Sequence, residues 1–184
     1  MRKALYILGI LDDSDASWLA TAGKAQSIRT GTVVIEQGVP VDSVFIVIDG
    51  QLQVYSGSVE IARLQAGEIV GEISFVDSRP PSASVKAAVD SQVLAVPKSA
   101  LYAKLKKDLG FASRFYLSVA TFLADRLRVA THRLSTGQPG AGGDSEDDLD
   151  ELPPDMLENI ALASARFDMI VKRLGSRFAS NQGG

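Results

Sequence analysis

The stretch IVGEISFVDSRPPSASV (residues 69–85) decides how the rest of the chain is interpreted. It begins as a short apolar strand, passes Gly71-Glu72, leaves room for one helical turn, and returns to a strand at Ala83-Ser84-Val85. Glycine lets a ligand approach the main chain closely, and the free N–H groups at the start of a helix can bind an anion. With a carboxylate and two hydroxyls nearby, the stretch predicts a binding loop for a small phosphorylated ligand that carries a sugar hydroxyl.

Short β-strands are predicted on both sides of this loop, because apolar runs between residues 26 and 96 are separated by turn residues. Residues 44–48 form a continuous apolar run that predicts a buried strand, and Asp49-Gly50 after it is the strongest hairpin signal in the chain. The other predicted strands cover residues 27–29, 33–35, 52–55, 59–61, 69–70, 84–89 and 92–96. We therefore expect an α+β protein built on an eight-stranded antiparallel β-roll, similar to a jelly roll.

Helical patterns flank the predicted roll. Two short helices are expected at residues 2–9 and 14–24, with Asp13 or Ser14 as the cap of the second. A short helix at residues 98–107 precedes a long one that opens at Asp108 or Gly110.

The long helix carries two apolar stripes, which together cover nearly half of its circumference. The first has the spacing of a coiled coil: Tyr116, Ala120, Leu123, Leu127, Ala130 and Leu134. The second consists of Phe111, Phe115, Val119, Phe122 and Val129. We expect one stripe to lie on the roll and the other to form a homodimer; the alternative is that both stripes belong to the core.

A change of composition divides the chain into three parts. We expect a domain over residues 1–135, a flexible linker rich in Gly, Pro and acidic residues over 136–154, and an amphipathic helix over 155–184. The apolar side of this last helix would cover its own roll, that of a dimer partner, or another protein.

Composition argues against several functional classes. The 184 residues include 19 Lys or Arg against 22 Asp or Glu, without a basic face for nucleic acid, so we expect no direct DNA binding. No apolar run is long enough for a membrane span, and the lack of cysteine fits a reducing cytoplasm.

Metal sites and catalytic sites are also unsupported by the residue types present. The single histidine, His132, is insufficient for a metal-dependent oxygenase of the cupin type or for a Ser–His–Asp arrangement. The acidic run at residues 144–151 lacks the glycine of a calcium-binding loop. We therefore expect no metal and no enzymatic activity.

Two further segments, VFIVIDGQLQVY (44–55) and GEIVGEI (67–73), together with the order of helices and strands, resemble the cyclic nucleotide-binding domain. This is the domain of catabolite activator protein and of protein kinase A regulatory subunits. The resemblance covers about residues 5–134 and implies cAMP or cGMP as the ligand. Many bacterial relatives add a helix-turn-helix, whereas the single net-acidic helix after the linker does not fit one, so we expect a stand-alone bacterial member.

The resemblance also implies roles for particular residues. Gly71, Glu72 and Ile73 match the first half of the family's phosphate-binding cassette, and Ala83, Ser84 and Val85 match its end. The matching glutamate would accept a hydrogen bond from the ribose 2′-hydroxyl. Main-chain N–H groups near Ile73 and Ser74 would hold the phosphate, and the hydroxyls of Ser82 and Ser84 would contact phosphate or base.

One position departs from the family pattern. Pro81 stands where the family places the arginine that pairs with the cyclic phosphate, and Arg79 lies two residues earlier. Loss of such a charge-assisted contact, worth about 1.5–3 kcal/mol, weakens binding roughly 10- to 150-fold. Arg79 is long enough to reach the phosphate from its displaced position.

These observations lead to one functional prediction and one alternative. The prediction is a non-enzymatic sensor that binds a cyclic nucleotide and signals through helix movement to an unidentified protein partner. The alternative is a degenerate, ligand-free scaffold for protein interactions, or a module that binds a different nucleotide.

Overall fold

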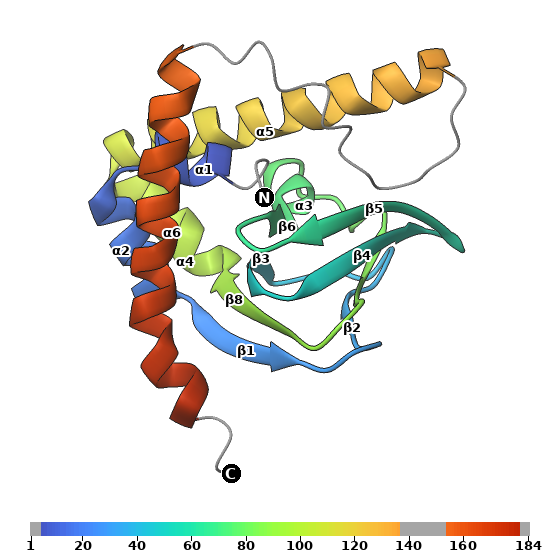
Figure 1. Cartoon of the computed structure of the whole chain (residues 1–184), viewed down its shortest axis with the longest axis horizontal. Coiled ribbons are helices and arrows are strands. Elements are labelled where there is room, and N and C mark those ends of the chain that lie inside the picture. The colour runs from blue at the N-terminus through green and yellow to red at the C-terminus, as the bar shows by residue number, and fades with distance from the viewer. Residues whose placement is uncertain (1–4, 137–153, 181–184) are drawn as a thin grey trace.

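Two four-stranded antiparallel sheets and the helices packed around them make up the computed structural model (Figure 1), which describes residues 5–136 and 154–180. The helices are α1 (Leu5–Ile10), α2 (Asp13–Ala22), α3 (Glu72–Val76), α4 (Lys98–Lys107), α5 (Leu109–Thr136) and α6 (Pro154–Ser180). The strands are β1 (Lys24–Ile28), β2 (Val33–Ile35), β3 (Ser43–Asp49), β4 (Gln51–Ser56), β5 (Val59–Gln65), β6 (Ile69–Val70), β7 (Ser84–Ala87) and β8 (Ser91–Pro97).

The sheets have the strand orders β1-β8-β3-β6 and β2-β7-β4-β5, so the predicted eight-stranded α+β roll is confirmed. Strand β3 is buried on both of its faces. Val44, Ile46 and Ile48 belong to the core shared with the helices, whereas Phe45 and Val47 belong to the core shared with the second sheet. The continuous apolar run of residues 44–48 follows from this position, because alternate side chains of a strand point to opposite faces.

The predicted hairpin at Asp49-Gly50 is wrong, although the chain does turn there. Strands β3 and β4 belong to different sheets, so Gly50 lies at a corner between them. Its φ of 88° is in the left-handed region, and a Cβ on Gly50 would lie 2.3 Å from Ser91 Oγ. The local sequence therefore predicted the turn correctly, whereas the pairing partner was decided by contacts with the neighbouring strand β8.

The cap of α2 differs from the prediction by one or two residues. Asp12 is the N-cap: its carboxylate accepts a hydrogen bond from the Asp15 N–H, and the Asp15 carboxylate accepts one from the Asp12 N–H. This reciprocal arrangement satisfies two N–H groups at the start of the helix. Asp13 and Ser14 were therefore the wrong choices, because an acidic residue three positions after Asp12 completes the pair.

The two stripes of α5 have different environments. The second stripe is core, with Phe111, Phe115, Val119 and Phe122 each at most 2% exposed. On the first stripe, Tyr116 is 47% and Leu127 68% exposed, so the alternative that both stripes are core is wrong for these two residues. Side-chain positions of Val129, Ala130 and Leu134 lie outside the part of the chain that the structure describes.

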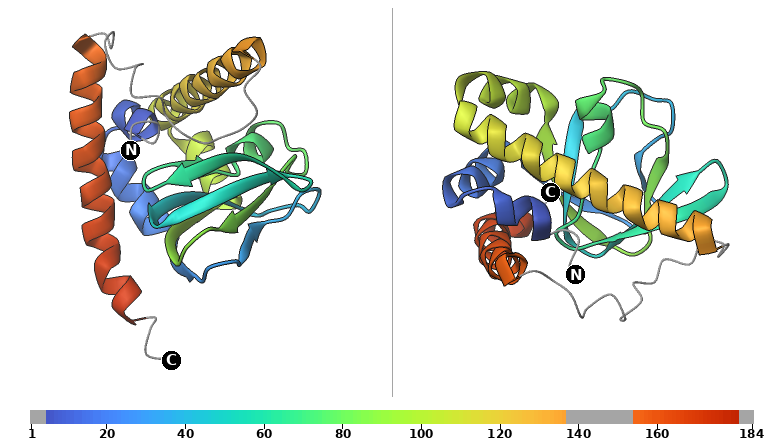
Figure 2. Two further views of the ribbon diagram at one scale, coloured as in Figure 1. Left: turned by 45° about the vertical axis from the view of Figure 1, so that its right-hand side comes forward. Right: turned by 90° about the horizontal axis from the view of Figure 1, so that it is seen from above.

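Helix α6 packs on α1, α2 and β1 of its own chain, and both views in Figure 2 show it alongside the two N-terminal helices. Arg166 fixes this contact, because its guanidinium donates to the carbonyl oxygens of Leu8 and Gly9 and pairs with Asp13. The predicted linker, except for its end residues 136 and 154, lies outside the described residues. None of the described helices combines the length and apolar character needed to cross a membrane.

Candidate functional site

The predicted binding loop, residues 69–85, joins the two sheets of the roll. It starts at β6, on the edge of one sheet beside β3, and ends at β7, which lies between β2 and β4 in the other sheet. Helix α3 lies between these strands (Figure 1). The two halves of the loop therefore come from opposite sheets.

Gly71 is the N-cap of α3 and has a φ of 91°, a left-handed backbone conformation that residues other than glycine rarely adopt. A Cβ there would lie 3.1 Å from the carbonyl oxygen of Ser43, so the close approach to β3 also favours glycine. Glu72 follows as the first helical residue and is 1% exposed, whereas Ile73 is 43% exposed. The turn thus holds a buried carboxylate at the positive end of a short helix.

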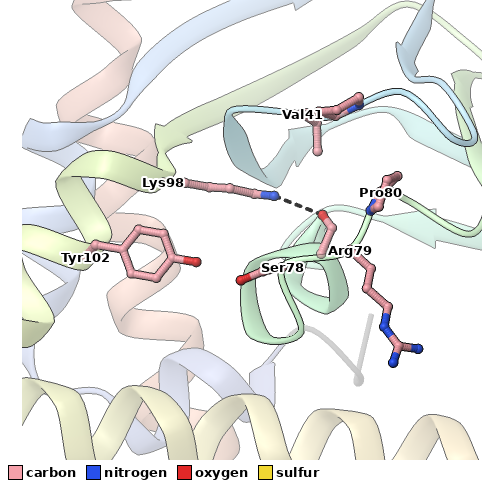
Figure 3. Close-up of a pocket in the computed structure, with 8 residues that line it drawn as sticks. Val41, Ser78, Arg79, Pro80, Lys98 and Tyr102 are labelled. Atoms are coloured by element: carbon pink, nitrogen blue, oxygen red, sulfur yellow. Dashed lines mark hydrogen bonds between the residues drawn. The ribbon is translucent and has the colours of Figure 1, made fainter.

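Ser74 connects α3 to the start of α4. Its hydroxyl donates to the Gly71 carbonyl (3.1 Å) and accepts from the Lys98 ammonium (3.0 Å). The dashed line in Figure 3 marks the bond from Lys98. Lys98 and Tyr102 of α4 line a pocket of about 260 Å³ whose other lining residues are Pro40, Val41, Ser74, Ser78, Arg79 and Pro80. Partial burial lowers the pKa of Lys98, and the nearby carboxylates of Asp42 and Asp77 oppose that effect.

The second half of the loop is tied to the turn that follows β2. The Gly38 N–H donates to the Pro81 carbonyl oxygen (2.8 Å), and the Gln37 N–H donates to Ser84 Oγ (3.0 Å). Ser82 is exposed and Ala83 is half-buried against the core between the sheets. The Ser84 hydroxyl thus already accepts a hydrogen bond within the protein, and Pro81 has no N–H to offer.

Arg79 lies on the exposed part of the loop after α3. Its N–H donates to Asp77 Oδ1 (2.9 Å), and Ser78 before it has a φ of 58°. In Figure 3 the Arg79 guanidinium points away from Lys98 and Tyr102. The structure therefore brings Gly71, Glu72 and Ser74 together within one turn, whereas Arg79 is directed elsewhere.

Comparison with known proteins agrees with this geometry. A family model described as "Cyclic nucleotide-binding domain" matches residues 25–108, which include both sheets except for Lys24 at the start of β1, and all of α3 and α4. The chain carries a domain of the cyclic nucleotide-binding family. Its β-roll, the loop at residues 69–85 and the order of its helices are those expected from the resemblance.

Two relatives of this domain are regulatory or kinase proteins. The cGMP-dependent protein kinase egl-4 of Caenorhabditis briggsae is 34% identical over 71 residues, which is 39% of this chain and 10% of the kinase. A cAMP-dependent protein kinase regulatory subunit of Hypocrea atroviridis is 28% identical over 116 residues, 62% of this chain and 25% of that protein. The chain therefore spans a quarter or less of the length of these two relatives.

Solved structures share the fold. A cyclic nucleotide-binding domain from Methylobacillus flagellatus superposes with a TM-score of 0.66 at 21% identity, covering 76% of this chain and 84% of that one. The catabolite activator protein of Thermus thermophilus superposes with a TM-score of 0.57 at 18% identity, covering 91% of this chain and 85% of that one.

An aromatic cluster links the loop of this cyclic nucleotide-binding domain to α4 and α5. The ring of Phe75 stacks on Tyr102 (4.5 Å between centroids) and meets Phe115 edge-on (5.7 Å). The Tyr102 hydroxyl donates to the Phe75 carbonyl oxygen (2.9 Å). Phe75 is a buried residue of α3, so a displacement of α3 changes the packing of the Phe75 ring on both α4 and α5.

Sequence reasoning missed Lys98 and Tyr102. Helix α4 was predicted with its observed bounds, but its residues had no assigned role, because helical periodicity does not reveal which side chain reaches another element. The only local signal is the position of Lys98 directly after Pro97 at the start of the helix. Among the described residues, no group of three or more His, Cys, Asp or Glu could hold a metal ion.

Proposed function

We propose that this domain is a non-enzymatic regulatory module that binds a cyclic mononucleotide, cAMP or cGMP, and signals through movement of α5 to a protein partner. The supporting observation is the start of α3, where left-handed Gly71 turns the chain so that the buried carboxylate of Glu72 and the main-chain N–H groups of Ile73 and Ser74 lie in one helical turn. This pair suits a ligand that offers an anion and a neighbouring hydroxyl group.

Each loop residue has a role in this proposal. Glu72 accepts a hydrogen bond from the ribose, and N–H groups at Ile73 and Ser74 hold the phosphate. Ser82 and Ser84, with Ala83 between them, line the side of the phosphate or base, and Arg79 turns inward to contact the phosphate when ligand is present. The packing of Phe75 on Phe115 supports transmission to α5, because a ligand that shifts α3 disturbs that contact.

Calorimetric titration of the purified chain tests this function. We expect heat of binding with cAMP or cGMP. The absence of heat with cAMP, cGMP and cyclic dinucleotides, each at about 1 mM, would leave less than about 4 kcal/mol of binding free energy and overturn the sensor. Binding of a cyclic dinucleotide alone would favour a different nucleotide.

A ligand-free scaffold is the second candidate. It is favoured by Pro81, whose carbonyl is held by the Gly38 N–H, and by the outward direction of Arg79. In that case the roll would bind a partner protein without any bound nucleotide, and the titrations above would show no heat of binding.

Restoring the family's arginine tests the register of the binding loop. We expect Pro81→Arg to tighten cAMP binding about tenfold, the low end for a charge-assisted contact, because the new side chain also loses conformational freedom. Val59→Arg, at a 62% exposed position on β5 that does not line the pocket, is the control and should leave affinity within about twofold, since it adds the same charge away from the loop. Equal affinities for wild type and Pro81→Arg would contradict the assigned register of the loop.

The exposed stripe of α5 supports a homodimer through this helix, because Tyr116 and Leu127 repeat with coiled-coil spacing and are uncovered in the single chain. We expect a dimer in sedimentation equilibrium and a monomer after Leu127→Lys. Leu162→Lys on α6, where the leucine is 42% exposed, is the control and should stay dimeric. A monomeric wild type would contradict this interface.

A further inference from the structure

Lys98 reaches the binding loop from outside it. It is the first residue of α4, and its ammonium donates to the hydroxyl of Ser74, which in turn donates to the carbonyl of Gly71. A chain of two hydrogen bonds thus runs from α4 to the residue that caps α3. Ser74 is 6% exposed and Lys98 is half-buried, so the serine end of this contact is shielded from water.

Two carboxylates act on this ammonium, and Arg79 and Tyr102 line the same pocket, although the Arg79 guanidinium points away from Lys98 (Figure 3). Asp42 comes from the loop before β3, Asp77 from the end of α3, Arg79 from the loop after α3, and Tyr102 from α4 itself. Among the residues that the structure describes, Lys98 forms no ion pair within 4.0 Å. Its positive charge is therefore not cancelled by direct contact and adds to the positive end of α3.

We propose that Lys98 replaces, from α4, the cation that Pro81 removes from the family's loop, and that it positions the first turn of α3 for the ligand phosphate by way of Ser74. This inference rests on the proposed function. Lys98 acts as a positioning residue: it orients Ser74 and thereby the N–H groups of that turn, and its charge favours an anion at the helix start.

Affinity becomes dependent on pH as a consequence. Burial lowers the pKa of Lys98, so the ammonium loses its proton at a lower pH than an exposed lysine does. As pH rises through that lowered pKa the charge is lost, and cAMP affinity falls. An arginine at the same position stays charged, so the Lys98→Arg protein shows no such fall.

Calorimetry with cAMP on four variants tests the inference. We expect Lys98→Met to weaken binding about tenfold and Lys98→Arg to keep it within about threefold, because charge rather than size is required. Ser74→Ala should weaken binding less, and the Ser74→Ala/Lys98→Met double variant should be no weaker than Lys98→Met, because the two residues act in series. The proposal would be overturned if Lys98→Met bound cAMP within about twofold of the wild-type affinity. It would also be overturned if the losses of the two single variants added up in the double variant.

A series of affinity measurements from pH 7 to 10 separates positioning by charge from simple packing. Wild type and Tyr102→Phe should both bind cAMP more weakly as pH rises, whereas the affinity of Lys98→Arg should stay constant. If Tyr102→Phe, rather than Lys98→Arg, is the variant whose affinity stays constant, the titrating group is the tyrosine and the role of Lys98 is overturned.

A readout without ligand keeps this inference distinct from the proposed function. Hydrogen exchange of the α3 amides should be faster in Lys98→Met than in Lys98→Arg, because only the arginine variant still donates to Ser74. If no nucleotide binds but exchange differs in this way, the sensor fails while the link from α4 to α3 stands. Equal exchange in both variants would remove the link itself.

Discussion

Replacement of Glu72 by alanine is expected to weaken cAMP binding about 10- to 150-fold, the range of a lost hydrogen bond to a charged group. Glu72 is 1% exposed at the start of α3, where a carboxylate is stabilised by the helix dipole and can face a ribose hydroxyl in a shielded site. Isothermal titration calorimetry of wild type and variant measures the change.

The choice of ligand shows whether the loss arises at the ribose. Wild type should prefer cAMP to 2′-deoxy-cAMP, and Glu72→Ala should bind the two with similar affinity, because the missing carboxylate and the missing hydroxyl are partners in one contact. If Glu72→Ala still prefers cAMP to 2′-deoxy-cAMP as strongly as wild type does, Glu72 does not contact the ribose.

A matched control separates this effect from damage to the fold. Glu68 is another buried carboxylate, 8% exposed, and accepts a hydrogen bond from the Gln65 N–H in the turn before β6. Glu68→Gln should lower the temperature of unfolding without changing cAMP affinity. A comparable loss of affinity in both variants would point to general destabilisation of the loop.

Arg114→Met is expected to lower the free energy of unfolding by about 3 kcal/mol, the low end for an uncompensated buried charge because Arg114 is partly exposed. Asp15 is 0% exposed, and its carboxylate accepts from Arg114 Nε (2.6 Å) and Nη2 (3.1 Å). Arg114 also pairs with Asp12, the cap of α2, and so ties α5 to the start of α2. Urea unfolding followed by circular dichroism measures the change in midpoint.

Two further variants identify the cause. Asp15→Asn in the Arg114→Met background should recover part of the lost stability, because the buried charge itself is removed. Arg63→Met removes one member of the exposed pair with Glu60 on β5 and should leave the midpoint unchanged. No recovery in the double variant would mean that Arg114 stabilises through its packing rather than through Asp15.

The order of strands and helices could be read from local patterns, because each pattern depends on neighbours in the chain. Strand β2 was predicted with its observed bounds, as was α4, and the apolar run of residues 44–48 correctly indicated a strand covered on both faces. The hairpin at Gly50 failed for a physical reason: a turn signal reports backbone conformation, whereas the pairing of β3 with β6 and β8 depends on distant residues.

The sequence by itself determined the roll, the glycine that starts α3 and the carboxylate beside it, because these follow from periodicity and from a backbone conformation that glycine alone adopts readily. Only the tertiary structure decided that Lys98 faces Ser74, that Arg79 points outward, and that α6 lies on α1 and α2 of its own chain. Such contacts join residues far apart in the chain, and their geometry is set by how the sheets and helices pack rather than by any local pattern.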